Sequence, residues 1–130
     1  MKNNFLEINS VNFQIGGKTK VKNASFYVEN EGEILCILGP SGIGKTTILR
    51  TIAGLEQIDK GLIKLNGKLL SSKDTHVEPE NRNISLAFQD NSLFPHYTVE
   101  KNILLGAVRN KKLKRKKLNY KEIINLLDIS

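Results

Sequence analysis

Residues 39–47 read GPSGIGKTT, and residues 33–38 directly before them read the apolar run EILCIL. The spacing is that of G-x-x-x-x-G-K-[ST], a pattern that binds phosphate when it follows a strand and opens a helix. Its fixed positions are occupied by Gly39, Gly44, Lys45 and Thr46. The run 33–38 predicts a strand buried on both faces. Apolar residues at helical spacing after the loop predict a helix that stops at Gly54.

The glycine-rich stretch has the composition that a phosphate chain requires. Glycines allow the backbone angles at which several N–H groups converge on one small volume. The following helix adds the positive end of its dipole. Lys45 supplies a charge for the β- and γ-phosphates, Thr46 a hydroxyl for Mg²⁺, and Thr47 a bond to another phosphate. The predicted phosphate-binding residues are Gly39, Pro40, Ser41, Gly42, Ile43, Gly44, Lys45, Thr46 and Thr47.

The segments around this stretch predict a mixed α/β fold. Apolar and polar residues alternate over 5–11 and again over 24–30, as in half-buried strands. Residues 61–70 predict a hairpin that turns at Asn66-Gly67. A second apolar run at 83–89 predicts another buried strand. Thr98 is a predicted N-cap, and 120–129 form a predicted amphipathic helix. Together these segments indicate an α/β core with a small antiparallel sheet attached.

The net charge of +7 on 130 residues is a local feature. One run carries seven cations, which account for the whole excess: Arg109, Lys111, Lys112, Lys114, Arg115, Lys116 and Lys117. Three interpretations stay open for this run: a solvated linker, a segment near anionic lipid, or a nucleic-acid contact. The run lacks the interleaved aromatic residues that stack on bases.

The remaining composition excludes several classes of protein. Cys36 is the single cysteine, so no disulfide forms within the chain, and its apolar neighbours predict that it is buried. The N-terminal residues lack the apolar core of a secretory signal. No apolar run reaches the roughly 18 residues of a membrane span.

The order of these motifs resembles the ATP-binding subunit of ABC transporters. The resemblance runs from about Leu6 to Gly106 and continues more weakly to the end. Its most specific parts are GPSGIGKTTILRTIAGLE at 39–56, the P-loop or Walker A motif, and AFQDNSLFPHYTVEKNI at 87–103, which is similar to the family's Q-loop. The resemblance implies a P-loop NTPase with ATP and Mg²⁺ as cofactors.

In this family the Q-loop glutamine meets Mg²⁺ and the water near the γ-phosphate, and Gln89 occupies its place. The resemblance therefore implies catalytic roles for Lys45 and Gln89, and metal contacts for Thr46 and Gln89. An amide both donates and accepts hydrogen bonds, which suits a residue between a metal and a water. The residues after Gln89 touch the membrane subunits in the family. Here these are Leu93, Phe94, Pro95 and His96.

The adenine contact departs from the family pattern. Such proteins stack an aromatic ring on the base, but the matching position is Ile15. Phe13 lies two residues earlier and would take this role if the register were shifted, although it also suits the core of the sheet. Val21 is expected to pack against the sugar or base. The choice between Phe13 and Ile15 stays open.

The resemblance implies one ABC ATPase domain, of which 1–130 form a truncated N-terminal part. The expected organisation is an antiparallel β subdomain at about 1–32 and 60–75, core strands and helix at about 33–59 and 82–90, and the start of a helical subdomain at about 97–130. The family's signature, Walker B strand and switch histidine are absent from these residues. We therefore expect nucleotide binding without hydrolysis by this chain alone.

The implied function is an ATPase subunit that drives solute import. AGLEQ and LFPHYTV are closest to iron(III)-type importers, while sugar, polyamine and sulfate importers are similar. Implied partners are membrane permease subunits and a second ATPase subunit, at the cytoplasmic face of the inner membrane as a peripheral protein. Nucleic acid is not an expected partner. The alternative is a soluble ABC-type ATPase that acts on nucleic acid through the basic run.

We expect the chain not to bind duplex DNA at physiological salt, because a charge run without stacking aromatics binds only electrostatically and salt weakens such binding steeply. Titration with duplex DNA and co-sedimentation with anionic vesicles, each at low and physiological salt, test this. DNA binding that persists at physiological salt, without vesicle binding, would favour the nucleic-acid alternative.

Overall fold

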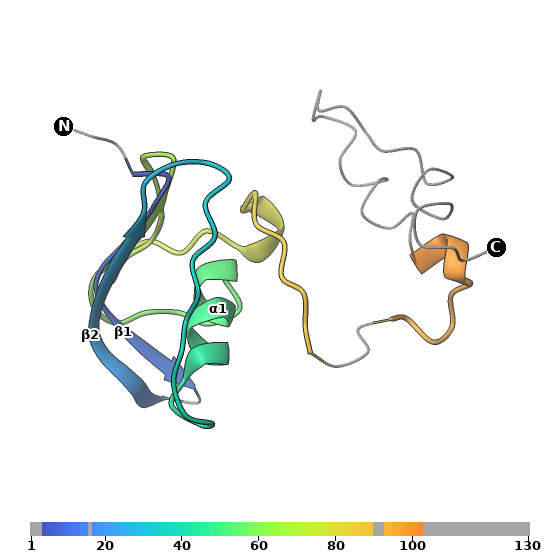
Figure 1. Ribbon diagram of the computed structural model, residues 1–130, viewed down its shortest axis with the longest axis horizontal. Helices are drawn as coiled ribbons and strands as arrows, with labels where there is room; N and C mark the ends of the chain where they lie inside the picture. The colour runs from blue at the N-terminus through green and yellow to red at the C-terminus, as the bar shows by residue number, and fades with distance from the viewer. Residues whose placement is uncertain (1–3, 16, 90–92, 103–130) are drawn as a thin grey trace. The chain divides into compact units, whose positions relative to one another are not determined.

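The computed structural model describes residues 4–15, 17–89 and 93–102 (Figure 1). It divides into two units, Met1–Leu86 and Ala87–Ser130. The described residues of the first unit form one sheet, one α-helix and one short 3₁₀ turn. Its elements are β1 (Leu6–Ile15), β2 (Lys18–Val28), α1 (Lys45–Ala53), β3 (Leu62–Leu65), β4 (Lys68–Ser71) and η1 (Pro79–Asn81).

The sheet has the order β2-β1-β3-β4, and every neighbouring pair is antiparallel. The hairpin predicted for 61–70 is confirmed, because Leu65 pairs with Lys68 across the two-residue turn. Asn66 and Gly67 have φ values of 49° and 75°. Positive φ at both positions is the geometry that the Asn-Gly pair favours and that matches the twist of the adjoining strands.

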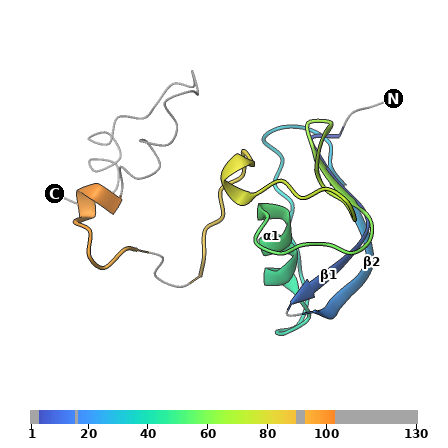
Figure 2. The ribbon, with the colours of Figure 1, turned by 180° about the vertical axis from the view of Figure 1, so that it is seen from behind.

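The β1–β2 pair is longer than the alternating segments predicted and contains register shifts. Ser10 lies at one shift with a φ of 53°. Its N–H donates to Ser25 Oγ at 2.9 Å, so a side chain replaces the bond that the irregular ladder omits. Figures 1 and 2 show that the paired strands curve, with α1 along one face of the sheet.

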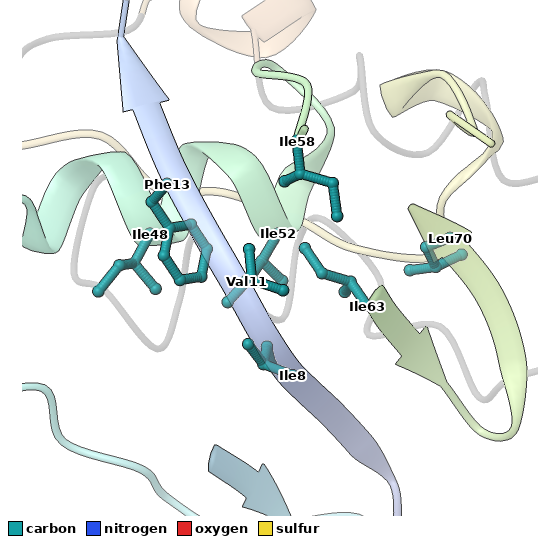
Figure 3. Packing of buried hydrophobic residues seen from close by; sticks show 8 residues of the cluster. All are labelled: Ile8, Val11, Phe13, Ile48, Ile52, Ile58, Ile63 and Leu70. Carbon is teal, nitrogen blue, oxygen red and sulfur yellow. The ribbon is translucent and has the colours of Figure 1, made fainter. Parts of the chain in front are cut away.

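The hydrophobic core lies between this sheet and α1. Figure 3 shows side chains of β1 facing Ile48 and Ile52 of α1, with contributions from β3, β4 and the segment after the helix. Phe13 is 0% exposed at the centre of the group. The cluster comprises Ile8, Val11, Phe13, Ile48, Ile52, Ile58, Ile63 and Leu70. The predicted helix is confirmed, and Ile48 and Ile52 lie on its buried face, whereas Leu49, part of the same apolar spacing, is 46% exposed.

The strands predicted at 33–38 and 83–89 are not formed in the structure. Within the described residues neither segment pairs with a neighbouring strand. A strand of a parallel sheet needs such a neighbour to satisfy its backbone, so composition alone does not create it. Ile34 and Leu38 are 91% and 90% exposed, and Cys36, predicted to be buried, is also exposed.

Part of the second unit confirms a capping prediction. Residues 99–102 are helical, and Thr98 Oγ1 accepts the N–H of Lys101 at 3.2 Å. The predicted helix 120–129 and the basic run 109–117 lie outside the described residues. Among the helices of the described part, none has the length and apolar character needed to cross a membrane.

We predict that Phe13→Ala destabilises the fold by about 3–5 kcal/mol, because it leaves a cavity at a fully buried position. Urea denaturation measures the change. Tyr27→Ala, on the neighbouring strand at 57% exposure, is the control and should cost less than about 1 kcal/mol. Equal losses in the two variants would contradict the position of Phe13 in the core.

Candidate nucleotide-binding site

The glycine-rich loop leads directly into α1, which begins at Lys45. Gly44 stands at the N-cap with φ 110° and ψ 13°, and no side chain caps this end of the helix. A residue with a Cβ adopts this left-handed region only at a cost. The first N–H groups of an α-helix have no partner within the helix and carry the positive end of its dipole. This end of α1 is therefore suited to an anion.

The Lys45 side chain folds back over the loop that precedes it. Its Nζ donates to the carbonyl oxygens of Gly39 and Pro40, at 2.7 and 2.8 Å. The ammonium group therefore lies within the loop, where the phosphate pattern requires a positive charge. The structure shows that the Lys45 ammonium contacts the loop. That Lys45 and the loop bind phosphate together remains a prediction.

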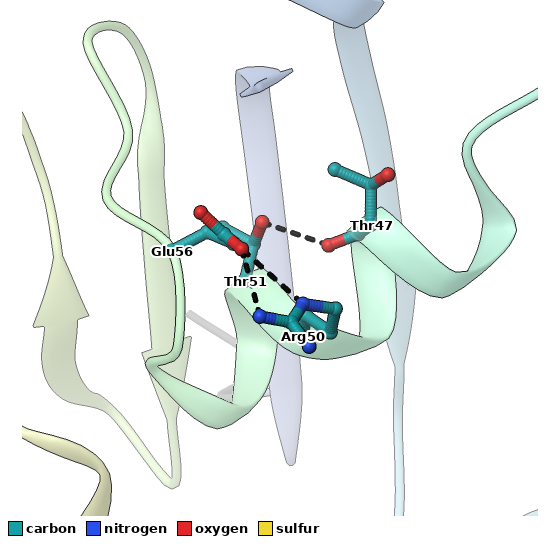
Figure 4. Close-up of polar contacts among 4 residues, drawn as sticks. All are labelled: Thr47, Arg50, Thr51 and Glu56. Carbon is teal, nitrogen blue, oxygen red and sulfur yellow. Dashed lines mark hydrogen bonds and ion pairs between the residues drawn. The ribbon is translucent and has the colours of Figure 1, made fainter. Parts of the chain in front are cut away.

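The two threonines of the motif have different environments. Thr46 is exposed, so its hydroxyl is accessible from the solvent. Thr47 is buried, and its carbonyl oxygen accepts a hydrogen bond from Thr51 Oγ1 at 2.8 Å (Figure 4). In the described residues no group of three His, Cys, Asp or Glu side chains forms a metal cluster. The exposed Thr46 hydroxyl is nevertheless suitable for Mg²⁺, which usually takes few protein ligands together with phosphate oxygens.

The C-terminal end of α1 is capped by backbone hydrogen bonds, whereas its N-terminal end has no side-chain cap. Leu55 N–H donates to Arg50 O at 2.9 Å and Gly54 N–H to Thr51 O at 3.0 Å. These two bonds form a Schellman cap, with Gly54 in the left-handed region as predicted. Arg50 also donates to Glu56 Oε1 from Nη2 at 3.0 Å and from Nε at 3.2 Å (Figure 4).

Arg82 was not singled out from the sequence, yet it is a buried cation, at 4% exposure. It lies in a polar stretch, NRN, that carries no local signal of burial. Burial lowers the pKa of its guanidinium below the ordinary value, and the carboxylate of Glu78 partly offsets this effect. His76, in the same loop, has Nδ1 at 3.5 Å from Arg82 Nη2.

The structure places two of the adenine candidates in or beside the core. Phe13 belongs to the buried cluster, and its partner across the β1–β2 ladder is Val21. Val21 is partly buried and packs against the same cluster. Ile15 is the last residue of β1 and pairs with Lys18. The adenine contact remains a prediction.

Gln89 lies in the second unit and is exposed. The segment that follows it contains an aromatic group in which the His96 and Tyr97 ring centroids are 4.3 Å apart and those of Phe94 and Tyr97 are 5.4 Å apart. Asn102 holds this turn to the helix. Its Oδ1 accepts the Phe94 N–H at 2.9 Å, and its Nδ2 donates to Phe94 O at 3.2 Å. Sequence reasoning did not identify Asn102, because an asparagine inside a helix gives no such signal.

Comparison with known proteins gives consistent matches. The profile of a family described as "ABC transporter" matches residues 21–130. The spermidine/putrescine import ATP-binding protein of Pasteurella multocida is 40% identical over 93% of this chain. The sulfate/thiosulfate import ATP-binding protein of a Synechocystis species is 39% identical over 94%. The Fe(3+) ions import ATP-binding protein of Fusobacterium nucleatum is 38% identical over 92%.

These matches cover only part of the relatives. The chain spans about a third of their length, namely 32%, 33% and 33%. A solved structure of a nucleotide-free ATP-binding cassette from an ABC transporter has a TM-score of 0.50 and 27% identity. That match covers 59% of this chain and 28% of the solved one. The expected α/β fold of a P-loop protein with an antiparallel sheet is thereby confirmed.

We predict that Gly44→Ala destabilises the fold by about 1–2 kcal/mol, the cost of a side chain in the left-handed region. Thermal unfolding monitored by circular dichroism measures this. Ser41→Ala in the same loop is the control, because Ser41 is exposed and is not among the residues with positive φ. No difference between the two variants would show that the loop does not require glycine at position 44.

Proposed function

This chain belongs to the ABC transporter family, and we propose that it binds ATP for a protein that couples ATP hydrolysis to solute import across a membrane. The observation that carries this proposal is the loop before α1, with the Lys45 ammonium within 2.8 Å of two of its carbonyl oxygens. The names of the three relatives reported above, each an import ATP-binding protein, support the direction of transport.

The hydrogen bonds of Lys45 explain why phosphate would bind there. The carbonyl oxygens of Gly39 and Pro40 are neutral acceptors, whereas phosphate oxygens carry charge. The ammonium donor is charged in both cases, so a bond to a phosphate oxygen adds an attraction between opposite charges that a neutral carbonyl oxygen cannot supply. Lys45 is therefore expected to exchange its carbonyl partners for the β- and γ-phosphates, while N–H groups of the loop and of the first turn of α1 bind the remaining oxygens.

Catalysis in the whole protein would depend on positioning and electrostatic stabilisation of the phosphates. Thr46 and Gln89 are the proposed Mg²⁺ contacts, and the ion would neutralise charge on the phosphate oxygens. Gln89 would also orient the attacking water through its amide. The acidic Walker B residue, the general base and the signature are not among these 130 residues. Hydrolysis is therefore proposed for the whole protein and not for this chain alone.

The base would be bound with little selectivity. Ile15 and Val21 are the proposed contacts, with Phe13 as the alternative to Ile15. An aliphatic contact lacks the extra stabilisation of about 0.5–1.5 kcal/mol that stacked aromatic pairs gain. Phe13 is already packed among core side chains, which favours Ile15 for this role.

The proposed partners are permease subunits, and the proposed contact is the segment Leu93–His96. Leu93 and Phe94 are exposed apolar residues, and the turn that carries them is fixed by Asn102. An exposed apolar group on a fixed turn is suited to contact with another protein. A second copy of the ATPase subunit is also a proposed partner. The proposed location is peripheral, at the cytoplasmic face of the inner membrane.

The cargo is proposed only as a small ion or polyamine. Relatives named for spermidine/putrescine, sulfate/thiosulfate and Fe(3+) match at 40%, 39% and 38% identity. Because these identities are so close, the shared residues do not discriminate between the three cargoes. Iron(III), which AGLEQ and LFPHYTV favoured, remains one candidate among them.

We predict that Lys45→Ala weakens ATP binding by at least 1.4 kcal/mol, roughly tenfold, because a charge-assisted contact is lost. Isothermal titration calorimetry on the chain with Mg²⁺ and ATP measures the effect. Lys68→Ala removes an exposed lysine of β4 and should leave the affinity unchanged. Equal affinities of the parent and Lys45→Ala would refute the proposed phosphate site.

A further inference from the structure

Arg82 is buried, and its guanidinium donates hydrogen bonds from all three of its nitrogens. The acceptors are neutral groups from three parts of the first unit: the end of α1, the end of β4 and the loop before η1. Nε donates to Val77 O at 2.7 Å, Nη1 to Thr51 O at 3.1 Å and Ile52 O at 2.8 Å, and Nη2 to Leu70 O at 3.3 Å and Ser71 Oγ at 2.7 Å.

Two of these acceptors belong to the last turn of α1. The Schellman cap satisfies the carbonyl oxygens of Arg50 and Thr51 from within the chain's own turn. The carbonyl oxygen of Ile52 accepts from Arg82 instead, at 2.8 Å. A buried carbonyl without a partner is costly, and a cation at the C-terminal end of a helix is favoured by the helix dipole. Arg82 therefore completes the cap of α1.

Gly54 makes this arrangement possible. A Cβ at this position would lie 2.6 Å from Arg82 Nε and 2.9 Å from its Cζ. The guanidinium thus occupies the space beside the glycine. Glycine is consequently required at position 54 for two reasons. Its φ is 91°, and a side chain there would overlap the Arg82 guanidinium. The cap and the arginine form one structural unit.

The apolar face of α1 cannot fix the helix along its own axis as well as these contacts do. Burial of Ile48 and Ile52 is favourable but non-directional, so it tolerates small displacements along the axis. The five hydrogen bonds from the planar guanidinium allow much smaller displacements, because each requires a particular distance and direction. At the loop end of α1 no side chain caps the helix, and Lys45 bonds only to carbonyl oxygens of the loop itself. The bonds of Arg82 at the far end instead join α1 to β4 and to the loop before η1.

We propose that Arg82 is a positioning residue for nucleotide binding, which ties the end of α1 to the end of β4 and thereby sets the position of the phosphate loop at the other end of the helix. The helix spans nine residues, about 14 Å at 1.5 Å per residue. A displacement at one end of so short a helix is carried to the other. This inference rests on the proposed function, since its consequence is an altered affinity for ATP.

Lysine is the informative substitution. Its ammonium keeps the charge but presents three donors from one atom, so it cannot reach acceptors on three separate segments. The matched control is Arg50→Lys, the same chemical change on the side of α1 that pairs with Glu56. Both variants retain a cation near the helix. Only Arg82→Lys removes a buried guanidinium, because the Arg50 side chain is 36% exposed.

The experiment compares the parent chain, Arg82→Lys and Arg50→Lys by three measurements. Amide resonances of Gly42 and Gly44 are recorded without nucleotide, the dissociation constant for Mg²⁺ and ATP is measured by calorimetry, and thermal unfolding is measured separately. We expect Arg82→Lys to shift both loop resonances and to weaken ATP binding about two- to thirtyfold, the range for changes transmitted through packed networks. Arg50→Lys should do neither.

A lower unfolding temperature with unchanged loop resonances and unchanged affinity would show that Arg82 is only structural and would overturn the proposal. If Arg82→Lys does not fold, Ser71→Ala replaces it, because this variant removes one acceptor of the guanidinium. The same shifts, smaller in size, support the proposal, and their absence overturns it. If the parent itself does not bind ATP, the proposed function fails, while the loop resonances still decide whether Arg82 positions the loop.

Discussion

The apolar contact between α1 and β1 is the interaction on which the first unit depends. Ile48 and Ile52 meet Val11 and Phe13 across this contact, and the hairpin of β3 and β4 extends the same core. Removing apolar surface from water is the main favourable term in folding. The same contact also fixes the position of α1, which begins at the end of the glycine-rich loop. The position of the glycine-rich loop therefore follows from the packing of α1 against the sheet.

Several local elements were predictable because a few adjacent residues determine them. Asn66-Gly67 sets its own turn, since both residues readily adopt positive φ. Gly54 ends α1 for the same backbone reason, and Thr98 caps the helix at 99–102 with its own hydroxyl. The glycine-rich loop belongs to this class, because its spacing places glycine, lysine and threonine at the start of a helix.

Other features were not predictable because they depend on residues distant in the sequence. Arg82 is buried only because acceptors at positions 51, 52, 70, 71 and 77 meet around it. In isolation the stretch NRN is typical of a solvated loop. The strand predictions for 33–38 and 83–89 were wrong in the opposite sense, because the local signal was present and the structure did not form. Their composition suits strands, but no described strand lies beside them to accept and donate the ladder bonds.

The position of β1 between β2 and β3 has a consequence for the order of folding. β1 and β2 are joined by a short turn, as are β3 and β4, so each pair closes a small loop. The β1–β3 ladder instead pairs Leu6 with Leu65 and Ile8 with Ile63, and the chain between these strands contains the glycine-rich loop and α1. Closing a long loop costs chain entropy before any contact compensates for it. We therefore expect both hairpins to form early and the β1–β3 ladder to form at the rate-limiting step. A high φ-value for Ile63→Val would support this order, and a value near zero would contradict it.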